Sequence, residues 1–501
     1  MNMVILPVIL PMITAITALI MGKPSLSRRT IVIVSSVAQF AVAIRLLELC
    51  WSSGPQVMPV GGWNATIGIT LVIDLLSAVM LSLSSTTILA GEIYGFFELP
   101  AKFEHPLRIP LLQFLLVGIN LSFCTGDLFN LFVAFEVMLT ASYALLTLEA
   151  DNWDIKQAFP YVTINIIEST LFLAAAGMCY SLFGTLNFAH IARLSALNAG
   201  DPRLPMIAML LLVVFSMKAG LFPFYFWLPH SYPTLPTPVA ALYSGVLTKV
   251  GIYVLLRLFC TVLPHELHSA HSVLAWLSGL TMLLGVIGAI SRNYIRGILS
   301  FHILSQVGFM TLAIGFFTPA SIAAAIFYII HHIIVKSSLF LIGGVAACLN
   351  RTDNLANMGG LWRSASFIGI LFLCQGLSLA GLPPLSGFWG KYLIVVEGLR
   401  KGEYVLVGVS ILASILTLFS MLKIWLAAFW AERADTAVHR EDPRWPRLAG
   451  VAAVLTAISL AIGFGAEGFI RLSRRAAEAA LDRSNYIEAV MSAQGKNREA
   501  D

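Results

Sequence analysis

Residues 206–223 read MIAMLLLVVFSMKAGLFP, an apolar run that ends in a lysine, a glycine and a proline. Lys218 stands directly before this Ala-Gly-Leu-x-Pro stretch at 219–223. Proline removes a backbone donor and clashes with the preceding turn, and glycine weakens the same turn. The segment therefore predicts an apolar helix that is interrupted, with backbone amides and carbonyls left free beside a lysine.

The same interruption recurs later in the chain. Residues 379–384 read LAGLPP, an aromatic pair follows each break, and Lys391 lies just beyond the second one. Paired Gly/Pro interruptions in two halves of a chain are typical of internal repeats in transporters, with ion or substrate sites at the breaks. The alternative is a pair of structural kinks without a transport role. The residues predicted to break the helices are Gly220, Pro223, Gly381, Pro383 and Pro384.

Composition indicates that most of the chain lies in lipid. Of its 501 residues 58% are hydrophobic and 11% are charged, and the mean hydropathy is +0.85, whereas soluble proteins carry roughly 25% charged residues. About 20 mostly apolar residues cross the hydrocarbon layer, which predicts an all-α membrane protein of about fourteen transmembrane helices. The predicted spans are 2–21, 30–50, 68–92, 107–124, 128–147, 160–184, 204–227, 237–262, 273–290, 298–317, 321–348, 365–397 (broken), 404–430 and 448–469.

The two breaks suggest how these spans are organised. Three N-terminal helices occupy 1–106, and a first repeat of five helices covers 107–262 with its broken helix near 218–228. A second repeat covers 273–430 with its broken helix near 381–391. The last span, 448–469, precedes a polar tail at 471–501, which we expect to be amphipathic or disordered.

Loop charges orient the helices. Lysine and arginine gather in cytoplasmic loops, and one side of the predicted bundle holds Lys23, Arg28, Arg29, Lys102, Arg108, Lys156, Arg292, Arg296, Arg351, Arg363, Arg433, Arg440, Arg444 and Arg447. The opposite side holds Arg193, Arg203, Arg400 and Lys401. The sequence therefore predicts a multi-pass protein of the cell membrane, with both termini outside the cytoplasm.

Several function classes are disfavoured. The net charge of +5 is spread over short loops, so nucleic acid is not an expected partner. The six cysteines show no CxxC spacing, and His331 and His332 lack an HExxH motif or a carboxylate cluster, so neither a metal nor a cofactor is predicted. No GxxxxGK[ST] phosphate loop occurs, which disfavours ATP-driven transport within this chain.

Charged residues inside apolar runs are the candidate functional residues. A charge near the bilayer centre costs at least ~2.5 to 3.5 kcal/mol, so each one needs a reason. Glu136, Lys218, Lys249 and Lys391 all lie in apolar surroundings. The alternative for the first three is a fixed structural ion pair. The alternative for Lys391 is a side chain that reaches to the membrane interface. Asp74 and Glu168 also lie in apolar runs, where a structural role is the first interpretation.

A third basic cluster lies in 329–337, IIHHIIVKS, where His332 and Lys336 share a helical face at i, i+4. Histidine titrates near neutral pH, so a row of such groups can pass protons from one to the next. The residues His331, His332 and Lys336 are therefore predicted to support a proton relay, with a hydrogen-bonded structural role as the alternative.

Taken together, the run around Glu136, the break at 218–223, the 228–233 loop before Lys249, the 331–336 helix and the 383–391 stretch resemble one family. The chain is similar to the antiporter-like subunits shared by respiratory complex I and Mrp-type multisubunit Na+/H+ antiporters. The resemblance implies two inverted five-helix repeats, each with a broken helix. The chain length and Lys391 favour the D-type subunits of the Mrp branch.

The resemblance also implies roles. Glu136 would modulate Lys218, Lys249 would be the central relay, the His331, His332 and Lys336 helix would be a bridge, and Lys391 would be the terminal exchange site. The implied partners are the lipid bilayer and Mrp subunits of types A, B, C, E, F and G, with protons and Na+, or K+ or Li+, as the transported ions. We therefore expect a subunit of a secondary transporter and not an enzyme. Two rivals stay open: a proton-pumping subunit of complex I or of a membrane-bound hydrogenase, and a scaffold subunit that transports nothing.

Overall fold

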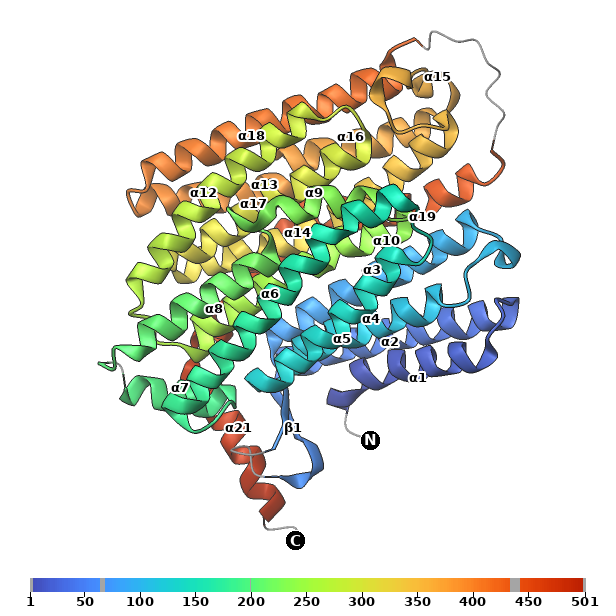
Figure 1. The fold of residues 1–501 in the computed structure, drawn as a ribbon. Helices are drawn as coiled ribbons and strands as arrows, with labels where there is room; N and C mark the ends of the chain where they lie inside the picture. Colours follow the sequence, from blue (N-terminus) through green and yellow to red (C-terminus); the bar gives the residue numbers. More distant parts are fainter. Residues whose placement is uncertain (1–2, 64–67, 199, 433–441, 499–501) are drawn as a thin grey trace.

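The computed structural model describes residues 3–63, 68–198, 200–432 and 442–498, so Arg433 and Arg440 lie outside the described residues. Long helices run side by side in one bundle, and α14 passes through its middle (Figure 1). The first half of the chain contains η1 (Met3–Ile5), α1 (Leu6–Met21), α2 (Leu26–Ser53), β1 (Gln56–Pro59), η2 (Val60–Gly62), β2 (Thr70–Ile73), α3 (Leu75–Glu98), η3 (Ala101–Phe103), α4 (Arg108–Cys124), α5 (Leu128–Thr147), α6 (Asn152–Phe183), α7 (Phe188–Leu197), α8 (Arg203–Ala219), η4 (Phe224–Phe226), α9 (Trp227–Ser231), η5 (Tyr232–Thr234), α10 (Thr237–Leu242), η6 (Tyr243–Leu247), α11 (Thr248–Leu256) and η7 (Arg257–Val262).

The second half is helical as well. It contains α12 (His268–Ser291), α13 (Ile295–Phe316), α14 (Pro319–Asn350), η8 (Leu355–Asn357), α15 (Leu361–Ser364), α16 (Ser366–Ala380), α17 (Ser386–Arg400), α18 (Tyr404–Ile424), η9 (Trp425–Trp430), α19 (Trp445–Phe464), α20 (Ala466–Leu481) and α21 (Arg483–Arg498).

Most predicted spans match these helices. Among the described residues, 12 helices are long and apolar enough to cross a membrane, and Arg108–Cys124 and Ser366–Ala380 are shorter apolar helices. The predicted limits 128–147, 237–262 and 404–430 coincide with the observed ones. Apolar length therefore predicts the helices well, and the prediction of an all-α membrane protein is confirmed.

Several predicted limits differ from the structure by a few residues; for example, α6 begins eight residues before the predicted 160–184, and two other differences have a clear local cause. The span 68–92 starts too early, because β2 pairs antiparallel with β1 and Asp74 then caps α3 by accepting a hydrogen bond from the Ser77 amide at 2.9 Å. The last span, 448–469, ends too late, because α19 stops at Phe464 and a new helix, α20, begins after Gly465. The tail that follows is helical as far as it is described, and α20 is amphipathic, with small residues on its buried side.

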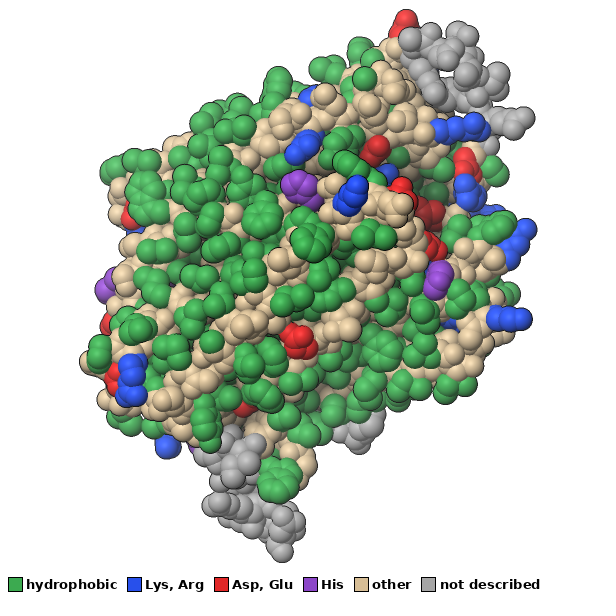
Figure 2. Space-filling model, viewed as in Figure 1, with side chains coloured by type: hydrophobic (Ala, Val, Ile, Leu, Met, Phe, Trp, Pro, Cys, Tyr) green, Lys and Arg blue, Asp and Glu red, His purple; other side chains and the backbone are tan. Residues whose placement is uncertain are grey.

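Charged residues gather at the two ends of the bundle. Figure 2 shows a face covered largely by hydrophobic side chains, with most blue and red side chains toward the upper right and lower left margins. Contacts at one end join residues predicted to be cytoplasmic, such as Arg29 with Glu104 at 2.7 Å and the Arg444 guanidinium with the Glu98 carbonyl at 2.6 Å. Both chain ends lie at the opposite end (Figure 1).

Candidate functional site

The first break ends α8 in a tight turn. Gly220 adopts φ +79°, a left-handed conformation that favours glycine, and the Leu221 amide donates to the Ser216 carbonyl at 2.9 Å. The groups freed by the break find partners inside the protein: the Trp227 indole donates to the Met217 carbonyl at 3.3 Å, and the Phe222 amide donates to Thr281 Oγ1 at 2.9 Å. The break is thus stable at depth because protein, and not lipid, satisfies its backbone.

The second break repeats this geometry. Gly381 has φ +93° and ends α16, and the Leu382 amide donates to the Leu377 carbonyl at 3.1 Å. Lys391, on α17, donates from Nζ to the Ala380 carbonyl at 3.0 Å and lies 4.6 Å from the centre of the Phe309 ring. Its exposed fraction is 6%, so Lys391 lies inside the bundle. Each break also contains a cis peptide bond, before Pro223 and between Pro383 and Pro384.

Lys218 is surrounded by polar groups of α5 and α6. Its ammonium donates to Asn165 Oδ1 at 3.1 Å and lies 5.6 Å from the centre of the Phe135 ring. Two carboxylates lie within electrostatic reach of it, with Glu168 the stronger partner and Glu136 the weaker. Both Glu168 oxygens are buried without a hydrogen bond to any described residue, whereas Glu136 accepts one from Ser169 at 2.5 Å. The structure thus brings Lys218 and Glu136 together and adds Glu168.

Lys249 begins a close link between the first break and the middle of the bundle. It follows the π-helical turn η6, and its ammonium donates to the Ser244 carbonyl at 2.5 Å and to Thr248 Oγ1 at 3.1 Å. Such turns leave carbonyls open and are frequent at functional sites. On the same helix, a Cβ added to Gly251 would lie 3.1 Å from Lys218 Cβ, so glycine permits α11 to pack against α8 beside Lys218.

The α14 helix carries the next groups. His332 and Lys336 are fully buried, and no described residue accepts or donates a hydrogen bond at the His332 ring nitrogens or Lys336 Nζ. Lys249 lies within electrostatic reach of both. His331 contacts Ser386 Oγ through Nδ1 at 2.7 Å, at the start of α17. The predicted bridge therefore lies between Lys249 and the second break.

Sequence reasoning missed His302. This residue is buried in α13, its Nε2 contacts Ser420, and it lies within electrostatic reach of Lys336, His332 and Lys391. The sequence does contain a signal for His302, because it is a titratable residue inside the apolar run 301–304, as Lys218 and Lys249 are in theirs. His302 adds a second connection between the α14 cluster and Lys391.

Arg257 was also missed, and it explains Asp74. The Arg257 guanidinium binds both Asp74 oxygens, at 2.6 and 2.7 Å, and also contacts Ser77 and Tyr253. Both charges are almost fully buried, at 2% and 3% side-chain exposure. This bidentate pair lies at the end of the bundle opposite the Arg29 cluster and agrees with a structural role for Asp74.

Replacing Asp74 with alanine should lower the stability of the protein by about 3 to 5 kcal/mol, because it leaves the buried Arg257 charge without its partner. Thermal unfolding of the purified membrane complex measures the effect. Glu48→Ala is the matched control, since its pair with Arg45 is about 60% exposed and contributes little. An equal melting temperature for the two variants would contradict the structural role of the Asp74 pair.

No group of three or more His, Cys, Asp or Glu side chains in the described ranges is arranged to hold a metal ion. The site is instead a row of single titratable groups that runs from Glu136 and Glu168 through Lys218, Lys249 and the α14 cluster to Lys391. What such an arrangement can do chemically is accept, hold and release protons along a buried line.

Comparison with known proteins gives consistent matches. Residues 125–417 match the family model described as NADH:quinone oxidoreductase/Mrp antiporter, TM. The chain is 39% identical to the D-type subunit of the Na(+)/H(+) antiporter of Alkalihalophilus pseudofirmus over 98% of this chain and 99% of that protein. It is 35% identical to the corresponding Na(+)/H(+) antiporter protein, also of the D type, of Bacillus subtilis over 98% and 99% of the two chains.

Solved structures give the same result at the level of the fold. A chain in the structure of the Mrp complex from Dietzia sp. DQ12-45-1b superposes with a TM-score of 0.90 and 29% identity, covering 97% of this chain and 99% of that one. A chain of an archaeal membrane-bound sulfane sulfur reductase superposes with a TM-score of 0.89 at 23% identity over 97% and 99% of the two chains, which shows a shared fold alone.

Proposed function

Since this chain belongs to the NADH:quinone oxidoreductase/Mrp antiporter transmembrane family, we propose that it is the D-type, proton-translocating subunit of a multisubunit Na+/H+ antiporter. The observation that carries the proposal is the series of buried titratable side chains that extends from Lys218 beside the first helix break to Lys391 beside the second. The named relatives are components of Na(+)/H(+) antiporters and the similar solved chain belongs to an Mrp complex. They support the antiporter setting over a redox-driven pump.

The proposed path starts at Lys218, whose ammonium is balanced by Glu168 and Glu136. It continues through Lys249 to His332 and Lys336, and then by His331 and His302 to Lys391 at the second break. We infer an exchange site at Lys391 because its ammonium donates a hydrogen bond to the Ala380 carbonyl, which the helix break leaves without a helical partner.

Repulsion between neighbouring cations couples one step of the path to the next. Lys249 and Lys336 interact electrostatically in a buried setting, where two like charges at short range are costly. A proton that arrives at Lys249 therefore favours release from Lys336 toward the histidines. Each elementary charge that crosses the membrane is worth ~2.3 kcal/mol per 100 mV, so a proton gradient can drive cation export.

The setting follows from the same family. We propose that the chain works in the cell membrane with Mrp subunits of types A, B, C, E, F and G, and that both termini lie outside the cytoplasm. The clustering of Arg29, Arg108 and Arg444 at one end of the bundle supports this orientation, because lysine and arginine gather on the cytoplasmic side.

The test is flux through the assembled complex in sealed vesicles. An imposed Na+ gradient should drive protons in the opposite direction, and Glu136→Gln should reduce that flux about tenfold, because one of the two charges that favour the Lys218 ammonium is removed. Glu149→Gln, an exposed carboxylate beyond the same helix, is the control. If vesicles show no Na+-dependent proton movement while redox subunits co-purify, the proposed function is wrong.

A further inference from the structure

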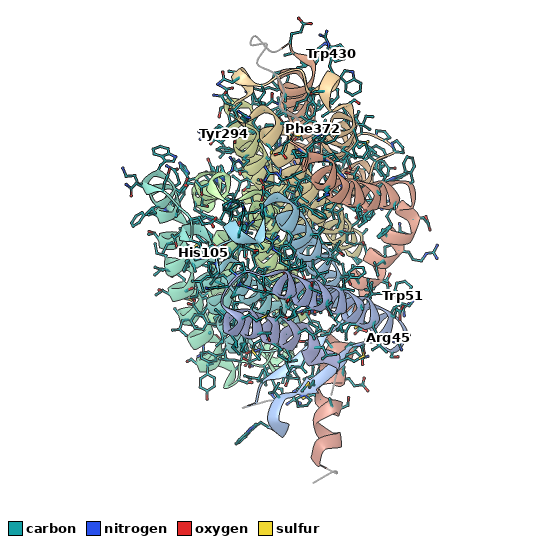
Figure 3. All side chains as sticks on the ribbon, turned by 90° about the vertical axis from the view of Figure 1, so that its right-hand side faces the viewer. Arg45, Trp51, His105, Tyr294, Phe372 and Trp430 are labelled. Atoms are coloured by element: carbon teal, nitrogen blue, oxygen red, sulfur yellow. The ribbon has the colours of Figure 1, made fainter. Side chains whose placement is uncertain are left out.

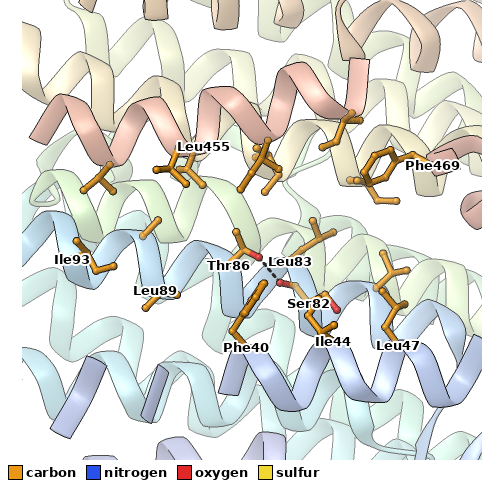
Figure 4. Close-up of a pocket in the computed structure, with 18 of the residues that line it drawn as sticks. Phe40, Ile44, Leu47, Ser82, Leu83, Thr86, Leu89, Ile93, Leu455 and Phe469 are labelled. Atoms are coloured by element: carbon orange, nitrogen blue, oxygen red, sulfur yellow. Dashed lines mark hydrogen bonds between the residues drawn. The ribbon is translucent and has the colours of Figure 1, made fainter. Parts of the chain in front are cut away.

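A long apolar groove opens on the surface away from the relay. It has a volume of about 750 Å³ and lies between α2, α3 and α19 (Figure 4). Its two hydroxyl side chains do not offer free polar groups, because Ser82 donates to the Ala78 carbonyl and Thr86 donates to the Ser82 carbonyl, each at 2.8 Å. The wall of the groove is therefore apolar over almost its whole length, and its occupant must be apolar as well.

One end of the groove is covered by α20. Phe469 and Leu472 of this helix line that end. The helix is fixed on both sides: the Arg475 guanidinium lies 4.2 Å from the centre of the Trp51 ring, and Thr261 Oγ1 donates to the Ala480 carbonyl at 2.9 Å. Figure 3 shows Trp51 on α2 near the margin of the molecule. Because α20 lies across this end, a membrane-spanning helix cannot pass straight through the groove.

The other end carries a single charge, Arg447. This residue is exposed, and its guanidinium has no hydrogen bond or ion pair with any side chain or backbone group that the structure describes. Its neighbour Arg444 is already bound by Asp442 at 2.6 Å and by the Glu98 carbonyl. Arg447 is thus a cation at the predicted cytoplasmic interface, at the mouth of an apolar groove.

The groove has the length of a lipid tail that starts at this interface. It extends along α19 from Arg447 to Ile462, and at about 1.5 Å per residue this is roughly 22 Å. The hydrocarbon layer is about 30 Å thick, so the groove begins at the headgroups and ends beyond the midplane.

We propose that this groove holds the acyl chain of an anionic phospholipid whose phosphate binds the Arg447 guanidinium. The apolar walls suit the tail, the arginine that no described residue pairs suits the phosphate, and the covered end excludes a transmembrane helix of another subunit. This lipid site does not depend on the proposed transport function.

The position of the groove gives the lipid a role. Ile330 and Ile334 of α14 form part of its floor. They flank His331 and His332 in the sequence, and Lys336 follows two residues after Ile334. An acyl chain in the groove keeps water from the rear of the α14 helix and so isolates its buried groups from proton leaks; this role, unlike the lipid site itself, rests on the proposed relay.

The experiment compares lipid retention in matched variants of the whole complex. The complex is reconstituted in nanodiscs of phosphatidylcholine with phosphatidylglycerol, transferred to detergent, and analysed by native mass spectrometry. Gly450→Trp fills the groove, since a Cβ there meets nothing within 4 Å, and Gly408→Trp on α18 is the control with the same free space. We expect one retained phosphatidylglycerol in the wild type and in the control, and none in Gly450→Trp.

A second pair of variants tests the headgroup. Arg447→Ala should reduce the preference for phosphatidylglycerol over phosphatidylcholine about fivefold, whereas Arg45→Ala on the surface of α2 should not change it. Retention that is equal in Gly450→Trp and the control overturns the site, and an unchanged preference in Arg447→Ala overturns the phosphate contact. Electron cryo-microscopy of the wild-type complex gives an independent check, because polypeptide density in the groove would also overturn the proposal.

Discussion

Replacing Glu168 and Glu136 together with glutamine should reduce Na+-driven proton flux by about 100-fold or more, while the complex still assembles. Both carboxylates lie within electrostatic reach of Lys218. At an effective dielectric constant near 20, one charge several ångströms away is worth about 2 kcal/mol or more, and each 1.36 kcal/mol is tenfold in rate. Without either carboxylate, Asn165 is the only polar partner that the described residues offer to the Lys218 ammonium. Lys218 then binds its proton too weakly to start the relay.

The two single variants separate the contributions. Glu168→Gln should reduce the flux more than Glu136→Gln, because Glu168 is the stronger electrostatic partner and is fully buried. Flux in vesicles that contain equal amounts of assembled complex is the measurement, with Glu149→Gln as the control. A double variant that transports like the wild type would remove both carboxylates from the pathway.

The sequence predicted the helices far better than their ends. Apolar runs of the right length identify spans because lipid leaves the backbone no other way to satisfy its hydrogen bonds. The errors at 68–92 and 448–469 have local causes: Asp74 is a buried charge that also caps α3, so the helix starts only after it, and α19 ends at Phe464 before Gly465. Neither the strand pair nor the turn into α20 changes hydropathy enough to be visible in the sequence.

The sequence indicates which residues belong to the site, but it does not indicate which residues they contact. A lysine or glutamate in an apolar run is conspicuous, so Lys218, Lys249 and Lys391 could be selected from the sequence. Contacts between helices are not encoded locally, and the pairing of Asp74 with Arg257 joins residues 183 positions apart. For the same reason Glu168 was ranked as structural, although α6 places it near Lys218. His302 was overlooked because it stands alone in its run, without the doubled histidine that drew attention to 331–332.

Replacing Lys336 with methionine should reduce the flux by about 100-fold and leave the thermal stability of the complex equal or higher. The loss of flux follows because a proton would have to cross this part of the bundle without a titratable carrier, at a cost of at least ~2.5 to 3.5 kcal/mol. The stability gain follows because no described residue accepts a hydrogen bond from Lys336 Nζ. An unpaired buried polar group costs about 1 to 3 kcal/mol, and methionine removes it while filling a similar volume.

Lys423→Met is the matched control because it should give the reverse pair of results. The Lys423 ammonium donates to the Ile290 carbonyl at 2.9 Å and to the Arg292 carbonyl at 2.6 Å, so its loss should lower the melting temperature and leave flux per folded complex unchanged. Opposite changes in the two readouts separate a transport residue from a structural one, which a flux assay alone does not. If Lys336→Met melts lower and transports normally, the α14 charges hold the bundle together and the scaffold interpretation takes the place of the relay.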